Sequence, residues 1–149
     1  MADLKIERDI EIEAPVDVVW RTITEPDQIR QWFASEVELD LRPGGRGYMG
    51  FDEHHGGPIV VVAVEPPTTF SFRWNHPAGE EPVEGNSVLV EFTLTALGAE
   101  RTHLRVMERG HDLLSWTDAD KERYAKEHNS GWPGYLDRLA GMHAARPME

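Results

Sequence analysis

Strand-like segments follow one another along the middle of the chain and are separated mostly by short turns rich in proline and glycine. Their ranges are 35–41, 47–53, 59–65, 68–74, 87–95 and 101–108. A parallel crossover needs a dozen or more residues, so the short links predict antiparallel hairpins in series. The longest link, residues 75–86, is acidic and holds two prolines and two glycines, which predicts a loop.

The segment before this series changes from a strand period to a helix period. Every second residue from Leu4 to Ile12 is apolar except Arg8, which predicts a half-buried strand. Apolar residues at helical spacing then predict a helix over 16–23. A second short helix is predicted to carry Ile29, Trp32 and Phe33 on one side.

Apolar and aromatic residues step by three or four positions through the end of the chain. They are Tyr124, His128, Trp132, Tyr135 or Leu136, Leu139 and Met142. This spacing predicts a long closing helix with one face against the sheet. Thr117 and Asp120 resemble an amino-terminal capping box. Pro133 predicts a kink or break, because proline removes a backbone hydrogen bond from a helix.

These elements predict an α+β fold in a single domain over residues 1–149. The fold has a first strand, two short helices, a six-stranded meander and a long carboxy-terminal helix that covers one sheet face. The length of 149 residues is that of one ordinary domain. A lipocalin-like barrel is the competing architecture, but it leaves the early helices and the long amphipathic tail unexplained.

Charge and composition exclude several classes of partner. Fifteen Lys and Arg against 27 Asp and Glu give a formal charge of −12, which disfavours nucleic acid and anionic membranes. The longest apolar run, Ile59 to Val64, is too short to span a bilayer, and the amino terminus shows no signal segment. With no cysteine as well, the sequence predicts a cytoplasmic protein without disulfides.

The sequence contains no recognisable catalytic or cofactor-binding motif. It lacks the Gly-x-Ser-x-Gly, P-loop, dinucleotide and zinc patterns, so we expect no cofactor and assign no catalytic residue. A non-enzymatic role is favoured, although one acid or base in a shaped cavity would suffice for catalysis. The cluster Asp52, Glu53, His54 and His55 predicts no metal site, because adjacent strand residues point to opposite faces.

The inward faces of the strands and the closing helix predict the wall of a ligand pocket. Pockets are mostly apolar with a few polar groups. The candidate ligand-binding residues are Arg8, Trp32, Phe51, Phe72, Trp74, Val90, Phe92, Glu108, Tyr124, His128 and Trp132. The alternative is that the apolar members of this set are packed core with no space between them.

Three polar residues in this set have two interpretations each. Arg8 and Glu108 interrupt apolar strand faces, and they either meet inside or at the mouth of the cavity or reach water at frayed or bulged positions. His128 lies on the inward face of the closing helix, one turn before Trp132. It is either a base or ligand donor, or a hydrogen-bonded histidine of the core or rim.

Several segments are similar to one known family. They are Ala14 to Trp20, Thr24-Glu25-Pro26, Trp32-Phe33, Phe70 to Trp74, Val90 to Leu94, Thr102 to Leu104 and Gly131-Trp132. In order and spacing they resemble the activator of heat-shock protein 90 ATPase homologue-like family, in the START-like or SRPBCC helix-grip superfamily. The resemblance spans roughly Ile6 to Met142. It departs from the pattern of many members at Glu108-Arg109-Gly110-His111, where they carry His-x-Gly.

The resemblance implies a helix-grip fold, in which a curved seven-stranded antiparallel sheet wraps around the last helix. It also implies a cavity for a small hydrophobic or amphipathic molecule, which makes a binding domain our first expectation. One alternative is a co-chaperone-like or regulatory interaction domain with a chaperone partner, active in stress response. The other alternative is a cyclase-like or hydrolase-like enzyme that uses the same cavity.

The run from Ile59 to Val64 bears on self-association, because it is apolar at both strand parities. Strict alternation would place three of its residues on the sheet face away from the helix. This outer patch is either covered by a second copy in a homodimer or formed by exposed valines, which strands favour.

Overall fold

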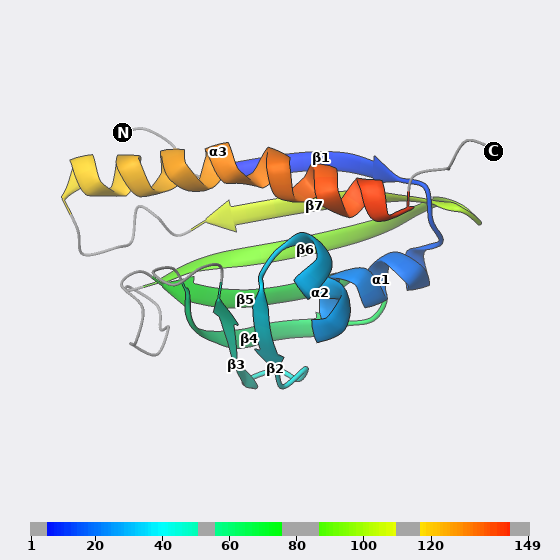
Figure 1. The fold of residues 1–149 in the computed structure, drawn as a ribbon, viewed down its shortest axis with the longest axis horizontal. Helices are drawn as coiled ribbons and strands as arrows, with labels where there is room; N and C mark the ends of the chain where they lie inside the picture. The colour runs from blue at the N-terminus through cyan, green and yellow to red at the C-terminus, as the bar shows by residue number, and fades with distance from the viewer. Residues whose placement is uncertain (1–5, 51–55, 76–86, 110–116, 144–149) are drawn as a thin grey trace.

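The computed structural model describes residues 6–50, 56–75, 87–109 and 117–143 (Figure 1). Their elements, in chain order, are β1 (Ile6–Ile12), α1 (Val16–Thr24), α2 (Pro26–Trp32), β2 (Glu36–Leu39), β3 (Arg46–Gly50), β4 (Gly56–Glu65), β5 (Thr69–Asn75), β6 (Ser87–Gly98), β7 (Arg101–Arg109) and α3 (Asp118–His143). Each element predicted from the sequence is present, with ends displaced by a few residues. Among the described residues, no helix is both long and apolar enough to cross a membrane.

The strands form one seven-stranded antiparallel sheet in the order β1-β7-β6-β5-β4-β3-β2. Consecutive strands from β2 to β7 pair as neighbours, which confirms the meander. β1 pairs with β7 from Ile6 opposite Glu108 to Ile12 opposite Thr102, so the first strand completes the sheet beside the last. β1 and β2 remain edge strands. The sheet is therefore open, and the α+β helix-grip arrangement is adopted rather than a barrel.

A single residue separates the two early helices. Glu25 is extended, with φ −87° and ψ 126°, because the residue before a proline is driven out of the helical region. Pro26 then opens α2, where its missing N–H costs nothing. α1 buries Val19 and Ile23 against the sheet side of the molecule. This tight corner places α2, and the residue that follows it, beneath α3.

α3 crosses the inner face of the sheet (Figure 1). Its first turn is capped as predicted, because the backbone N–H of Asp120 donates to Thr117 Oγ1 over 3.2 Å. Of the kink or break predicted near Pro133, the break is absent, since the helix is continuous from Asp118 to His143, and the kink stays a prediction. Pro133 is exposed. Where a helix faces solvent, water can satisfy a carbonyl that has lost its helical partner.

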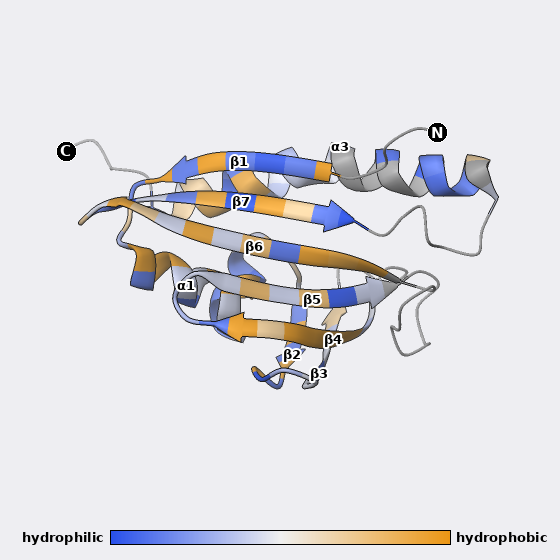
Figure 2. Ribbon diagram, turned by 180° about the vertical axis from the view of Figure 1, so that it is seen from behind, coloured by the Kyte–Doolittle hydropathy of each residue, from blue (hydrophilic) through white to orange (hydrophobic). Residues whose placement is uncertain are grey.

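A bulge in β4 changes the predicted alternation of the run Ile59–Val64. The register shifts between Val61 and Ala63, so Val62 is an extra residue that is 41% exposed. Ile59 and Val61 are buried before the bulge, and Val64 returns to the inner face opposite Phe70. The outer face therefore carries fewer valines than strict alternation predicts. Figure 2 shows this face from behind the molecule.

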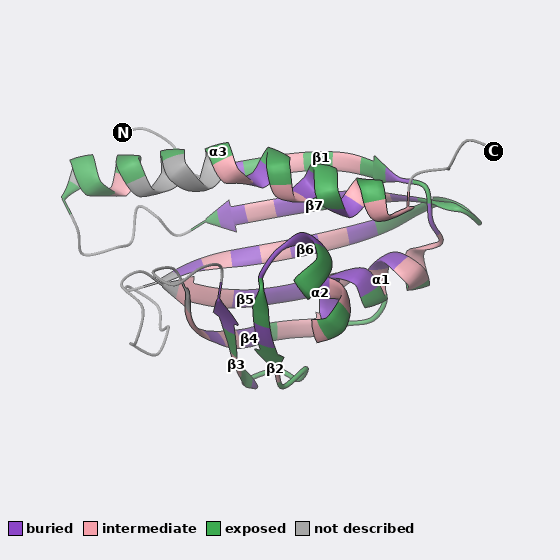
Figure 3. Ribbon diagram, viewed as in Figure 1, coloured by how far each residue is buried: buried purple, intermediate pink, exposed green. Residues whose placement is uncertain are grey.

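The hydrophobic core lies between the inner sheet face and the helices. Only the second half of α3 contributes buried residues among those described, namely Trp132, Leu136 and Leu139. Between residues 119 and 130, the described side chains are exposed apart from half-buried Lys121. Figure 3 shows this difference between the two halves of the helix. These three side chains anchor the second half of α3 over the sheet.

Candidate functional site

Aromatic side chains from both layers meet beneath α3 and form one connected group, which we call the aromatic cluster. Its members are Trp32, Phe33, Phe70, Phe72, Trp74, Phe92, Trp132 and Tyr135. Most of these rings pack edge to face, offset or tilted, which are the arrangements that aromatic pairs favour. The pairs of this group link α2, β5, β6 and α3 into one interior surface.

Phe33 occupies the centre of the aromatic cluster. Its ring centroid lies 5.0 Å from Trp32, 5.3 Å from Trp132, 5.5 Å from Trp74 and 4.9 Å from Tyr135. The side chain is 6% exposed. The sequence analysis placed Phe33 on one side of the second helix with Ile29 and Trp32 but did not include it among the site residues. Its position one residue after α2, where the helix ends, was the available signal.

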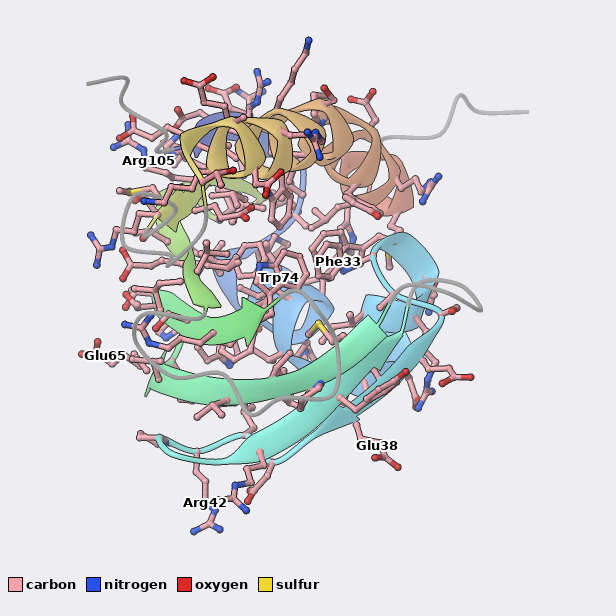
Figure 4. The ribbon with its side chains drawn as sticks, turned by 90° about the vertical axis from the view of Figure 1, so that its left-hand side faces the viewer. Phe33, Glu38, Arg42, Glu65, Trp74 and Arg105 are labelled. Atoms are coloured by element: carbon pink, nitrogen blue, oxygen red, sulfur yellow. The ribbon has the colours of Figure 1, made fainter. Side chains whose placement is uncertain are left out.

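The cluster runs from the core to the molecular surface. Phe70, Phe72 and Phe92 are fully buried, whereas Trp74 and Tyr135 are half-buried. Figure 4 shows Phe33 and Trp74 pointing toward each other beneath α3, while Arg105 points away on the other side of the sheet. Trp74 and Tyr135 are therefore the described aromatic residues through which a molecule would first meet the cluster.

Glu108 brings a carboxylate into this apolar interior. It lies on β7 between Ile6 of β1 and Val90 of β6, and it has no exposed surface. The indole N–H of Trp132 donates to Glu108 Oε2 over 2.8 Å. Burying a carboxylate is costly unless hydrogen bonds stabilise it. The interpretation that Glu108 reaches water at a frayed strand end is wrong.

Arg8 lies beside Glu108 on the same sheet face. Arg8 is opposite Val106 and Ile6 is opposite Glu108, so the two charged residues occupy diagonal positions on neighbouring strands. The Arg8 side chain is half-buried, and its Nε atom is shielded from solvent. The structure therefore brings the two charged residues together on the inner face, at the same end as Trp74 and Trp132.

A second polar junction lies at the other end of the interior. Trp32 Nε1 donates to the backbone oxygen of Thr22, over 2.9 Å. The Thr22 hydroxyl lies 3.0 Å from Val18 O and 2.8 Å from His143 Nε2. Burial lowers the pKa of His143 below its usual range, because it disfavours the charged imidazolium. The sequence carried no signal for this contact, which joins residues 121 positions apart.

Of the remaining predicted site residues, some have described side chains and others do not. Phe72 and Val90 are buried and opposite one another, and Val90 is also opposite Glu108. Phe51 lies outside the described residues, as do His54 and His55. Tyr124 and His128 lie on α3, but their side chains are not among those described. The roles assigned to all these residues stay predictions.

The described side chains offer apolar surface, one carboxylate and one guanidinium. Such an arrangement can hold an aromatic molecule and can accept or donate a proton at Glu108. Within the described ranges, no group of three or more His, Asp or Glu residues is placed to hold a metal ion.

Comparison with known proteins identifies the family. The model of the family described as Activator of Hsp90 ATPase homolog 1-like protein matches residues 13–144. The chain belongs to this family. The match begins one residue after β1 and runs through α3, which confirms the resemblance inferred from the sequence motifs. No curated protein matches the chain in a sequence search.

Solved structures similar to this family member include three of interest. Protein MLL2253 from Mesorhizobium loti has a TM-score of 0.77 and 27% identity, covering 93% of this chain and 95% of its own. DynU16, a protein of the dynemicin biosynthetic locus, has a TM-score of 0.75 and 28% identity, covering 94% of this chain and 47% of its own. The Aha1 dimer from Colwellia psychrerythraea has a TM-score of 0.73 and 20% identity, covering 96% of each chain.

Proposed function

We propose that this protein binds a small aromatic or otherwise apolar molecule between the inner sheet face and α3. The observation that carries the proposal is the aromatic cluster, which extends from buried Phe92 through Trp132 to half-buried Trp74 and Tyr135. A flat apolar ligand would pack against the rings of these side chains. Burial of roughly 200 Å² of its apolar surface would contribute about 5 kcal/mol before the costs of association.

The buried carboxylate of Glu108 supports a ligand that carries a polar group. A core that serves packing alone gains nothing from a buried acid, because well-packed apolar residues stabilise as much or more. Glu108 has two oxygens, and Trp132 donates to Oε2. A carboxylate can accept several hydrogen bonds, so a ligand hydroxyl or amine is a suitable additional donor. Arg8, diagonal to it, suits a ligand acceptor.

The similarity to DynU16 adds support from outside the chain. That protein belongs to the dynemicin biosynthetic locus, and its identity to this chain is 28%. A small-molecule setting for a relative favours a small-molecule ligand here. This chain spans about half of that protein (47%), so an activity of the whole relative does not transfer with the fold.

Catalysis is the second candidate, and Glu108 is the residue that favours it. A buried carboxylate beside an apolar surface can act as a general acid or base on a bound substrate. The replacement Glu108→Gln keeps the shape and removes the titratable group. An enzyme would lose turnover by about 10²-fold while still binding, whereas a carrier would change in affinity alone.

A chaperone partner and a homodimer also stay proposals. The family description supports the first, and the dimeric Aha1 from Colwellia psychrerythraea supports the second. Stimulation of a chaperone's ATPase rate by the purified protein tests the first, and light scattering at micromolar concentration tests the second. A stress-response role depends on the chaperone interaction, and a cytoplasmic location fits either ligand or chaperone binding.

The binding proposal is tested by thermal unfolding with a panel of flavonoids, polyketides, bile-acid-like compounds and lipids. A ligand present at about 100 times its Kd should raise the melting temperature by roughly 5–10 °C. Trp74→Ala should weaken the binding by about tenfold or more, because it removes a half-buried ring of the cluster. Tyr48→Ala, at an exposed position on β3, is the matched control and should leave the Kd unchanged.

A further inference from the structure

A row of alternating arginine and aliphatic residues crosses the outer face of the sheet. Arg46 is opposite Val60, Val60 is opposite Arg73, Arg73 is opposite Leu89, and Leu89 is opposite Arg109. The row therefore runs across neighbouring strands from β3 to β7. We call these five residues the outer row.

The outer row lies away from the aromatic cluster. The chain neighbours of its members, including Ile59, Val88 and Glu108, are buried on the inner face, and strand residues alternate between faces. Arg46 and Arg109 are exposed, and the three residues between them are half-buried. Figure 2 views this face, and no helix lies in front of β4 to β7. The described helices therefore leave the row open.

The charges of the row differ from those elsewhere on the same face. Arg105 pairs with Asp9 at 3.0 Å, and Arg101 lies 3.8 Å from Glu11. Among the described residues, neither Arg73 nor Arg109 has an ion-pair partner within 4.0 Å. In a chain with a net charge of −12, the outer row thus holds two neighbouring cations that form no ion pair among the described residues.

The spacing of the row restricts what can bind it. Adjacent strands are about 4.8 Å apart, so Arg73 and Arg109 are roughly 10 Å apart with Leu89 midway. Among regular structures, an α-helix repeats side chains at this distance on one face, because seven residues rise roughly 10 Å. Helix residues three or four positions after the first of these side chains lie halfway between the two, so they would contact Leu89.

We propose that the outer row binds an acidic amphipathic helix of a partner protein. The helix would present two carboxylates seven residues apart and an aliphatic residue between them. Arginine forms planar, two-pronged contacts with carboxylates, and Leu89 and Val60 supply apolar contact between the charges. The site lies on the face opposite the aromatic cluster, so it is independent of the proposed ligand.

The alternating pattern favours a protein helix over other anions. A membrane surface or nucleic acid presents phosphates without regularly interposed apolar groups. The net charge of −12 also repels extended anionic surfaces within the Debye length. Glu91 lies on the next row of the outer face, opposite Ser71 and Met107, and it opposes broad anionic surfaces in the same way.

The test is fluorescence anisotropy of a labelled, helix-stabilised peptide with Glu at positions 1, 8 and 15 and Leu at 4 and 11. The intact protein should bind it, and Arg109→Glu should weaken the binding by at least about fivefold. Arg73→Glu with Arg109→Glu should weaken it by at least about tenfold. Arg138→Glu makes the same charge change at an exposed position on α3 and should leave the Kd within about twofold.

Three results would overturn the proposal. The first is no anisotropy change at about 1 mM peptide. The second is a peptide Kd that Arg109→Glu leaves unaltered. Because Arg109 is exposed, this substitution should not disrupt the fold. The third is equal binding of vesicles that contain phosphatidylserine, with the same dependence on Arg109, which would assign the row to lipid. Occupation of the interior by a small molecule bears on none of these outcomes.

Discussion

Trp132 on α3 donates its indole N–H to the carboxylate of Glu108 on β7 over 2.8 Å, with 2% and 0% of the two residues exposed. This hydrogen bond ties the closing helix to the sheet through the middle of an apolar interior. Because the partners belong to elements separated by the link between β7 and α3, the bond also fixes how the helix lies on the sheet. Its removal should therefore affect both stability and the proposed binding site.

Trp132→Phe should lower the free energy of unfolding by about 2 kcal/mol or more. The change keeps an aromatic ring but leaves the buried carboxylate with one donor fewer, and such a loss costs about 1–3 kcal/mol. Urea denaturation measures the effect. In a Glu108→Leu background, which has no acceptor for the indole N–H, the same change should cost less, and an equal cost in both backgrounds would show that the bond does not stabilise the fold.

Phe33→Ala should be among the most destabilising single substitutions in the described chain. The ring contacts Trp32, Trp74, Trp132 and Tyr135, and loss of a buried Phe typically costs about 3–5 kcal/mol. Leu97→Ala is the control, because Leu97 is exposed and should change stability by less than about 0.5 kcal/mol. A similar small effect at Phe33 would mean that the cluster is loosely packed.

Stability should fall in mild acid through His143. Burial lowers the pKa of this imidazole in the folded protein, so the unfolded chain takes up the proton more readily. The contribution of His143 is therefore present above its unfolded pKa of about 6.5 and is lost as the pH falls below that value. The melting temperature between about pH 7.5 and about pH 5 measures the loss.

His143→Gln isolates this pH effect from other titrating groups. The glutamine amide can still donate to the Thr22 hydroxyl, but it does not titrate. The variant should lose less stability than the parent protein over the same pH interval. Identical pH slopes for the two proteins would show that His143 is not the group responsible.

The two halves of α3 should differ in amide hydrogen exchange. The second half buries Trp132, Leu136 and Leu139, whereas the described side chains from 119 to 130 remain largely exposed. Exposed side chains protect a helix little from local opening, so on the described side chains the amides before residue 130 should exchange faster than those of 136–142. If the first half gates access to the aromatic cluster, ligand binding should slow its exchange. Uniform protection along α3 would contradict both expectations.

Most of the fold followed from periodicity, because each strand and helix carries its apolar pattern within a few neighbouring residues. The β4 bulge did not, since it depends on how Val61 and Ala63 pair with β5 rather than on the local sequence. The break that the sequence allowed at Pro133 is also absent, while the kink stays a prediction. A local helix breaker is tolerated where its ring faces solvent and the rest of the helix is anchored by Trp132 and Leu136.

The sequence predicted many individual residues of the candidate site, but it did not predict how those residues contact one another. Alternation identified Phe72, Trp74 and Glu108 as inward-facing, and it placed Arg8 on the inward face of the first strand. The partner of Glu108 and the central place of Phe33 depend on where α3 and α2 dock. That docking sums contacts between elements far apart in the sequence, so no local pattern encodes it.

The most direct test of ligand binding beneath α3 follows the indole N–H signals of the five tryptophans by nuclear magnetic resonance during titration with compounds of the thermal panel. The account predicts saturable shifts of the Trp74 and Trp132 signals, with a smaller change at Trp20, which lies outside the aromatic cluster. If no compound moves the Trp132 signal at about 1 mM, or if saturable shifts occur only at outer-face amides such as that of Arg73, the central claim is contradicted.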